Sequence, residues 1–176
     1  MNENTKSALL VMDVQEAILG RVPNKEEYIA KVTAAVDAAH KKNMQVIYVV
    51  VGFREGAPEA NESQRRFAGS LTNPVPAIAP TGTDIVVTKR RISAFSGSDL
   101  EVILRAQNIR HLVLGGIATS GVVLSTVREA GDKDFKITVL SDLCADTDPE
   151  VHTILLTKVF ARQATVMTSE EWLKTQ

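Results

Sequence analysis

The sequence predicts a three-layer α/β/α sandwich around a mainly parallel six-stranded sheet with helices on both faces. Apolar runs and amphipathic helical segments alternate along the whole chain, which is typical of successive β-α-β units. Several of the apolar runs lack polar alternation, as expected for strands that are covered on both faces. No repeat, low-complexity segment or change in composition divides the 176 residues. We therefore expect one domain over residues 1–176.

The first part of the chain contains two predicted strands and one predicted helix. Residues 7–14 (SALLVMDV) form an apolar run that contains a carboxylate near its end. Residues 24–42 place apolar side chains every three or four positions, which predicts an amphipathic helix. Residues 44–51 are a continuous β-branched run and predict a buried strand. The connection 53–83 is rich in Gly, Pro and charged residues, and its length indicates a functional loop.

The middle of the chain repeats this alternation. Residues 84–88 (DIVVT) predict the next strand, and a helix is expected from 98 to 107 with Ser98 as its N-cap. Residues 111–115 predict the fourth strand. Residues 116–119 are small or β-branched, and a helix is expected over 120–130. Small residues at the carboxyl end of a strand allow backbone N–H groups to approach a ligand.

The last part of the chain supplies two more strands and two more helices. Residues 135–140 predict the fifth strand. The helix expected over 149–160 begins with a proline and has Asp148 as its N-cap. Residues 164–167 predict a short final strand, and residues 169–174 predict a short closing helix.

Composition excludes several classes of function. The formal net charge is −1 and aromatic residues make up 5%, so neither a basic stripe nor a base-stacking surface for nucleic acid is expected. No apolar run approaches the roughly 20 residues that span a bilayer, and no signal peptide is visible, so the cytoplasm is the expected location. The one cysteine, Cys144, cannot form an internal disulfide, and we expect it to be buried and inert. The three histidines lack the spacing of a zinc site, so no metal or cofactor is expected.

Three features follow the carboxyl ends of predicted strands. They are Asp13, Lys89 and the turn at 116–122. Parallel strands bring these ends to one edge of the sheet, where ligands bind in open α/β folds. An Asp and a Lys in a shared cleft set each other's charge state and can serve in proton transfer. The alternative is structural, because a strand-end Asp often caps a helix and a strand-end Lys is often solvated.

Three sequence blocks around these features resemble the isochorismatase-like hydrolases, the cysteine hydrolase superfamily. The blocks are LLVMDVQ at 9–15, KRRISAF at 89–95 and GIAT at 116–119, and their order and spacing agree over nearly the whole chain. The resemblance implies a catalytic triad of Asp13, Lys89 and a cysteine at position 122, where this chain has Val122. It also implies a cis Ile117–Ala118 peptide bond, with the N–H groups of Ala118 and Val122 directed into an oxyanion hole.

Val122 excludes attack by a thiolate at this position. Cys144 lies on a different predicted element and does not replace the missing nucleophile, while Thr119 and Ser120 are expected to cap the following helix. The resemblance offers one precedent without a thiol, since isochorismatases hydrolyse a vinyl ether with the Asp as the acid. Two alternatives stay open. One is a catalytically silent family member that binds a small molecule or a protein partner, and the other is that Val122 replaces an original cysteine by engineering.

The loop after the second strand is the expected source of substrate contacts. Residues 51–56 contain no histidine, which disfavours the metal cluster that nicotinamidase-type relatives carry there. Arginines in the loop could hold a substrate carboxylate through paired hydrogen bonds, and phenylalanines could line the pocket. The candidate substrate-binding residues are Gln15, Phe53, Arg54, Phe95 and Thr119, with Arg65, Arg66 and Phe67 as further candidates.

The resulting prediction is a hydrolase of a small-molecule substrate that uses Asp13 as the acid or base and Lys89 as its electrostatic partner. The bond is a vinyl ether or a related C–O or C–N bond. The resemblance also implies a homo-oligomer, a dimer or larger.

Overall fold

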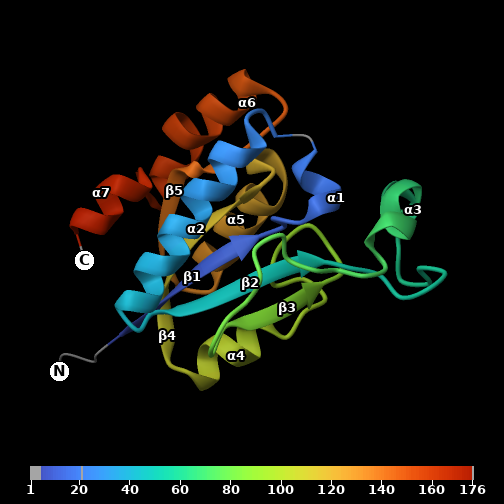
Figure 1. Cartoon of the computed structure of the whole chain (residues 1–176), viewed down its shortest axis with the longest axis horizontal. Coiled ribbons are helices and arrows are strands. Elements are labelled where there is room, and N and C mark those ends of the chain that lie inside the picture. The colour runs from blue at the N-terminus through green and yellow to red at the C-terminus, as the bar shows by residue number, and fades with distance from the viewer. Residues whose placement is uncertain (1–4, 21, 176) are drawn as a thin grey trace.

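The computed structural model describes residues 5–20 and 22–175 and contains a six-stranded parallel sheet (Figure 1). The strand order is β3-β2-β1-β4-β5-β6, and every neighbouring pair is parallel. The strands are β1 (Lys6–Met12), β2 (Gln45–Val51), β3 (Ile85–Lys89), β4 (Ile109–Ile117), β5 (Lys136–Ala145) and β6 (Thr165–Met167). The predicted α/β class and six-stranded sheet are therefore confirmed.

Helices connect the strands and cover both faces of the sheet. They are α1 (Glu16–Leu19), α2 (Lys25–Lys41), α3 (Glu62–Ala68), α4 (Leu100–Ala106), α5 (Leu124–Asp132), α6 (Pro149–Ile154) and α7 (Ser169–Lys174). Four short helical turns join them: the 3₁₀ turns η1 (Gly69–Leu71) and η4 (Phe160–Arg162), and the π-helical turns η2 (Thr119–Val123) and η3 (Leu155–Val159). Because η3 and η4 follow α6 directly, the segment expected as one helix over 149–160 consists of an α-helix, then a π-helical turn, then the start of a 3₁₀ turn.

Alternation along β1 divides the core into two layers. Leu9 and Val11 pack with α2 and with Trp172 of α7 on one face. Leu10 and Met12 pack with residues of α4 and α5 on the other face. Both layers consist mainly of buried apolar side chains, which make the dominant favourable contribution to folding. The sheet edge at the carboxyl ends of the strands is thus held between two rigid layers.

The long connection contains structure that the sequence analysis did not predict. Helix α3 begins with a capping box, in which the Asn61 side chain accepts the Gln64 N–H and the Gln64 side chain accepts the Asn61 N–H. In Figure 1 α3 (green) stands apart from the sheet, beyond the carboxyl end of β2. It is followed at once by η1, whose Leu71 carbonyl accepts the Phe53 N–H at 3.0 Å. Hydrogen bonds within the loop therefore contribute to its order.

Two glycines near the end of β4 allow a close approach of backbone to backbone. A Cβ atom at Gly116 would lie 2.4 Å from the Met12 carbonyl oxygen, and one at Gly115 would lie 2.8 Å from Leu143 Cβ. Neither distance is compatible with a side chain. Small residues at this strand end are expected from the sequence to contact a ligand. In the structure they instead allow β4 to pack closely against β1 and β5. This packing fixes Met12, and with it the position of Asp13.

Candidate active site

The main cavity lies at the carboxyl edge of the sheet and has a volume of about 450 Å³. Its lining comes from the ends of β1, β2, β3 and β4, from α3 and from the turn η2. The lining residues are Asp13, Ala17, Ile18, Val22, Val51, Ser63, Gln64, Arg66, Phe67, Ser70, Leu71, Lys89, Arg91, Ile92, Ile117, Ala118, Ser120, Gly121, Val122, Asp146 and Thr147. Asp13, Lys89 and the turn after β4 therefore share one cavity, as their positions at strand ends predicted.

Asp13 and Lys89 form a buried ion pair in this cavity. The Lys89 Nζ atom lies 3.0 Å from Asp13 Oδ2, and the side chains are 3% and 9% exposed, respectively. Lys89 also donates a hydrogen bond of 2.8 Å to the Arg91 carbonyl. The second carboxylate oxygen, Asp13 Oδ1, has no hydrogen-bond partner among the described residues. One oxygen is thus held by the lysine, and the other is buried without a hydrogen bond from the described residues.

Burial changes the protonation of Asp13. Loss of water raises the pKa of its carboxyl from the ordinary 3.8 to about 6, and the neighbouring Lys89 charge opposes this rise only in part. The backbone of Asp13 has a φ of 56°, in the left-handed region, and its N–H donates to the Val49 carbonyl at 2.8 Å. Tight placement and a raised pKa are the properties of a group that can carry a proton near neutral pH.

The turn after β4 lines the same cavity as Asp13. The Ile117–Ala118 peptide bond is cis. Ala118, Gly121 and Val122 line the cavity, and the Val122 side chain is 2% exposed within the apolar core. The chain forms the π-helical turn η2 here before α5 begins at Leu124, so the helix expected from 120 is wrong at its start.

Thr119 and Ser120 do not cap this helix, contrary to prediction. The Thr119 hydroxyl is hydrogen-bonded to His152, and the Ser120 N–H donates to the Asp146 carboxylate. The residue at the N-cap position of α5, Val123, has no side chain that could accept a hydrogen bond. The turn is thus held by partners on another element.

Two predicted polar substrate-binding residues lie away from the lining of the main cavity. Gln15 is buried and pairs with the backbone of Val51, donating to its carbonyl at 3.1 Å and accepting from its N–H at 2.8 Å. This places Gln15 as a brace between β2 and the segment after β1. Arg54 points outward, with a side chain that is 68% exposed and an ion pair of 3.3 Å to Glu59.

The predicted contact residues Phe53, Phe95 and Thr119 also lie outside the lining of the main cavity. Phe95 is buried in the core and stacks on Phe135 at a ring-centroid distance of 5.8 Å. Phe53 is buried behind the cavity and contacts Phe67 edge to face at 6.4 Å. Of these aromatic rings only Phe67 lines the cavity. Thr119 is fully buried and is likewise absent from the lining.

Helix α3 supplies lining residues that sequence reasoning largely missed. The sequence names Arg66 as a further candidate, whereas it gives no binding role to Ser63 and Gln64 of α3 or to Arg91 after β3, which also line the cavity. Gln64 donates to the Arg90 carbonyl at 2.9 Å and accepts from Arg91 Nη1 at 3.3 Å, which ties α3 to the segment after Lys89. The Asn-x-x-Gln capping box was the available signal for α3.

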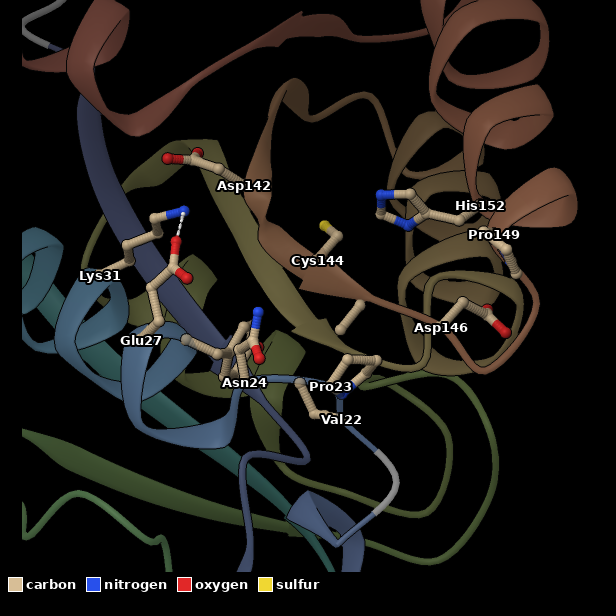
Figure 2. A pocket seen from close by; sticks show the side chains of 12 residues that line it. Val22, Pro23, Asn24, Glu27, Lys31, Asp142, Cys144, Asp146, Pro149 and His152 are labelled. Carbon is tan, nitrogen blue, oxygen red and sulfur yellow. Dashed lines mark ion pairs between the residues drawn. The ribbon is translucent and has the colours of Figure 1, made fainter.

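A second, smaller cavity of about 250 Å³ lies beside the first (Figure 2). It shares Val22 and Asp146 with the main cavity, and its lining includes Cys144, His152 and the Glu27–Lys31 ion pair. Burial raises the pKa of the Cys144 thiol to about 12. Cys144 lines this cavity and not the main one, so the structure gives it no position from which to replace the missing nucleophile.

The fold and this site define a known class of protein. Residues 7–171 match the Isochorismatase domain family, so the chain belongs to the isochorismatase family of hydrolases. An uncharacterized isochorismatase family protein, YwoC of Bacillus subtilis (strain 168), is 32% identical over 96% of this chain and 93% of its own length.

A second relative and a solved structure are also similar to this chain. The ureidoacrylate amidohydrolase RutB of Stutzerimonas stutzeri (strain A1501) is 31% identical over 94% of this chain and 77% of its own length. A crystal structure of a cysteine hydrolase from Pseudomonas syringae pv. phaseolicola 1448A superposes with a TM-score of 0.87. It is 22% identical and the match covers 96% of this chain and 91% of that one, so the likeness concerns the fold.

The described residues lack two other features, a metal cluster and a membrane-spanning helix. No group of three or more His, Cys, Asp or Glu side chains there is arranged to hold a metal ion. No helix in residues 5–20 and 22–175 is long and apolar enough to cross a membrane.

Proposed function

We propose that this hydrolase cleaves an enol ether, or a related C–O or C–N bond, in a small anionic molecule without a cysteine nucleophile. The observation that carries the proposal is the buried Asp13, which lines the main cavity, has a pKa raised to about 6 and has one carboxylate oxygen without a hydrogen-bond partner among the described residues. Asp13 is the acid and base, and Lys89 is its electrostatic partner. Val122 leaves no thiol at the position where acyl transfer would need one.

The reaction begins with protonation of the substrate. Protonated Asp13 gives its proton to the enol-ether carbon remote from oxygen, and the double-bond electrons form the new C–H bond. This leaves an oxocarbenium ion beside the Asp13 carboxylate, whose negative charge stabilises it. Water adds to the cationic carbon, and Asp13 takes back a proton from it. The hemiketal then breaks its C–O bond, giving a carbonyl compound and an alcohol.

The remaining cavity residues hold the substrate. The N–H groups of Ala118 and Val122 are the proposed oxyanion or substrate-positioning donors. Arg66 and Arg91 line the cavity from α3 and from the segment after β3, and neither forms an ion pair in the described part of the chain. Two guanidinium groups without a carboxylate partner favour a carboxylate or another anion on the substrate. Arg91 is held in place there, because its Nη1 donates hydrogen bonds to the Glu59 and Arg90 carbonyls and to the Gln64 side chain.

A second function, binding without turnover, is favoured by Val122 alone. Its side chain is apolar and 2% exposed at the position where the resemblance implies a nucleophile. A binding protein of this kind would keep the cavity and its cations and would lack turnover.

C–N bond hydrolysis is the other chemistry to test, because one relative is named as an amidohydrolase.

A substrate panel separates these functions. Isochorismate-like enol ethers, simple amides and ureido or N-carbamoyl compounds are incubated with wild type, Asp13→Asn, Val122→Cys and the control Cys144→Ser. We expect wild type and Cys144→Ser to hydrolyse the enol ether and Asp13→Asn to be inactive. Full enol-ether activity in Asp13→Asn would refute the proposed acid. Amidase activity that appears only in Val122→Cys would indicate that this chain has lost an amidase activity that depends on cysteine. Binding of a substrate without turnover by both wild type and Val122→Cys would favour the second function.

A further inference from the structure

The turn η2 is attached from outside at two successive residues. The Thr119 hydroxyl and His152 Nδ1 are hydrogen-bonded at 2.8 Å. The Ser120 N–H donates to Asp146 Oδ2 at 2.7 Å. Asp146 directly follows β5 and His152 lies on α6, so both attachments come from the segment that contains α6 and the connection before it.

The two attachments differ in their access to the main cavity. Ser120 and Asp146 line the main cavity, and a substrate there can reach them. Thr119 is fully buried, and His152 lines the second cavity only. Figure 2 shows His152 reaching from α6 toward the strand that carries Cys144. His152 therefore acts on the active-site turn from behind, with no access to the substrate.

The geometry of the turn makes the Thr119 contact consequential. Ala118 immediately precedes Thr119, and its carbonyl accepts the N–H groups of Gly121 at 3.0 Å and of Val123 at 3.3 Å. A fixed Thr119 side chain therefore fixes the plane of the peptide that follows Ala118, and with it the loop that carries Val122. Without a partner, the buried hydroxyl would have to turn elsewhere to find one.

His152 is itself held firmly enough to serve as an anchor. The Asp148 side chain caps α6 by accepting the N–H groups of Glu150 at 2.9 Å and Val151 at 3.1 Å. The backbone N–H of His152 donates to the Asp148 carbonyl at 3.0 Å. Partial burial lowers the pKa of the His152 imidazole, although the nearby Asp146 carboxylate acts in the opposite direction. A neutral ring leaves Nδ1 free to pair with a hydroxyl as donor or acceptor.

From this geometry we infer that His152 is a positioning residue for the reaction. It acts through Thr119 to hold the Ala118–Val122 turn in the orientation that the substrate requires. The inference rests on the proposed function insofar as that turn positions the substrate. It assigns to Thr119 a role other than direct substrate contact.

Two substitutions of His152 test the inference through the atom that makes the contact. The amide of Asn ends near the position of Nδ1, whereas the amide of Gln ends near the position of Nε2. We expect His152→Gln to lower kcat for the enol ether about ten- to a hundredfold with little change in KM, and His152→Asn to restore most of the loss. Thr119→Val should lower kcat as much as His152→Gln does. The double variant should lose no more kcat than either single variant, because both substitutions remove the same contact. Equal kcat losses in the Asn and Gln variants would overturn the inference.

A readout without substrate keeps the test independent of the proposed function. The backbone amide ¹H–¹⁵N resonances of Ala118, Gly121 and Val122 are compared between wild type and variants. We expect them to shift in His152→Gln and to return toward wild-type positions in His152→Asn. The control Thr153→Ala, also on α6, removes a hydroxyl that bonds only within the helix and should leave these amides unchanged.

The kinetic and the NMR measurements together distinguish failure of the positioning role from failure of the proposed reaction. Amides that shift as expected in a protein without hydrolytic activity would support the positioning role and reject the proposed reaction. Amides that stay in place in His152→Gln would overturn the positioning role whatever the activity.

Discussion

Replacing Asp13 with Asn should stabilise the folded protein at neutral pH, even though it removes one member of a buried ion pair. The reason is the raised pKa of the Asp13 carboxyl, which rises from 3.8 to about 6 through burial despite the opposing Lys89 charge. A carboxyl whose pKa is higher in the folded state is harder to ionise there than in the unfolded chain. Ionisation of Asp13 therefore costs folding free energy, and Asn does not ionise.

The size and the pH window of this effect follow from the two pKa values. One pKa unit corresponds to about 1.36 kcal/mol, so the rise from 3.8 to about 6 costs about 3 kcal/mol. The cost is absent below pH 3.8, grows between pH 3.8 and about 6, and is fully present above that. Asp13→Asn should thus match wild type at acidic pH and exceed its free energy of unfolding by up to about 3 kcal/mol at pH 8.

Urea unfolding between pH 4 and 8 measures the effect. Asp146→Asn is the matched control, because the pKa of the Asp146 carboxyl is shifted in the opposite direction. Burial acts to raise the pKa of the Asp146 carboxyl, but hydrogen bonds from Ser120 and neighbouring N–H groups outweigh it and lower the pKa. That variant should lose stability at neutral pH. If Asp13→Asn is no more stable than wild type at pH 8, the reasoning about the buried carboxyl is wrong.

Three further predictions concern packing, recognition and reactivity. Gly116→Ala should lower the free energy of unfolding by about 1–3 kcal/mol or more in a denaturant titration, because its Cβ would lie 2.4 Å from the Met12 carbonyl oxygen; an unchanged midpoint would contradict this. Arg66→Gln should raise KM for an anionic substrate about tenfold, since it removes a cation from the main cavity, whereas the exposed Arg65→Gln outside the lining should not; equal KM values would reject the anion site. Cys144 should resist thiol reagents at pH 8 in the folded protein and react after denaturation, because burial raises its pKa to about 12; rapid labelling of the native protein would be the contrary result.

The sequence predicted the fold because the local patterns and the tertiary structure agree. Residues 46–51, for example, are apolar throughout, and the corresponding strand β2 is packed on both faces of the sheet. The convergence of Asp13 and Lys89 was predictable for the same reason, since it follows from the common direction of parallel strands. The fifth strand was predicted too short, at 135–140. β5 continues to Ala145 because β4 and β5 resume pairing at Gly116 and Cys144 after an irregularity.

The substrate contacts were harder to predict because they depend on side-chain direction within a long connection. Arg54 and Arg66 look alike in sequence, yet one points to solvent and the other lines the cavity. Their difference arises from α3, whose capping box and contacts to the segment after Lys89 orient the helix. Thr119 likewise sits one residue beyond the cis bond, and only the three-dimensional structure shows that it faces His152.

The pH dependence of kcat/KM for enol-ether hydrolysis tests the proposed role of Asp13 most directly. An acid with a pKa of about 6 in the free enzyme predicts a rate that is highest below that pH and falls tenfold per unit above it. Asp13→Asn should abolish the activity at every pH. A rate that is independent of pH between 5 and 8, or full activity in Asp13→Asn, would contradict acid catalysis by the buried carboxyl.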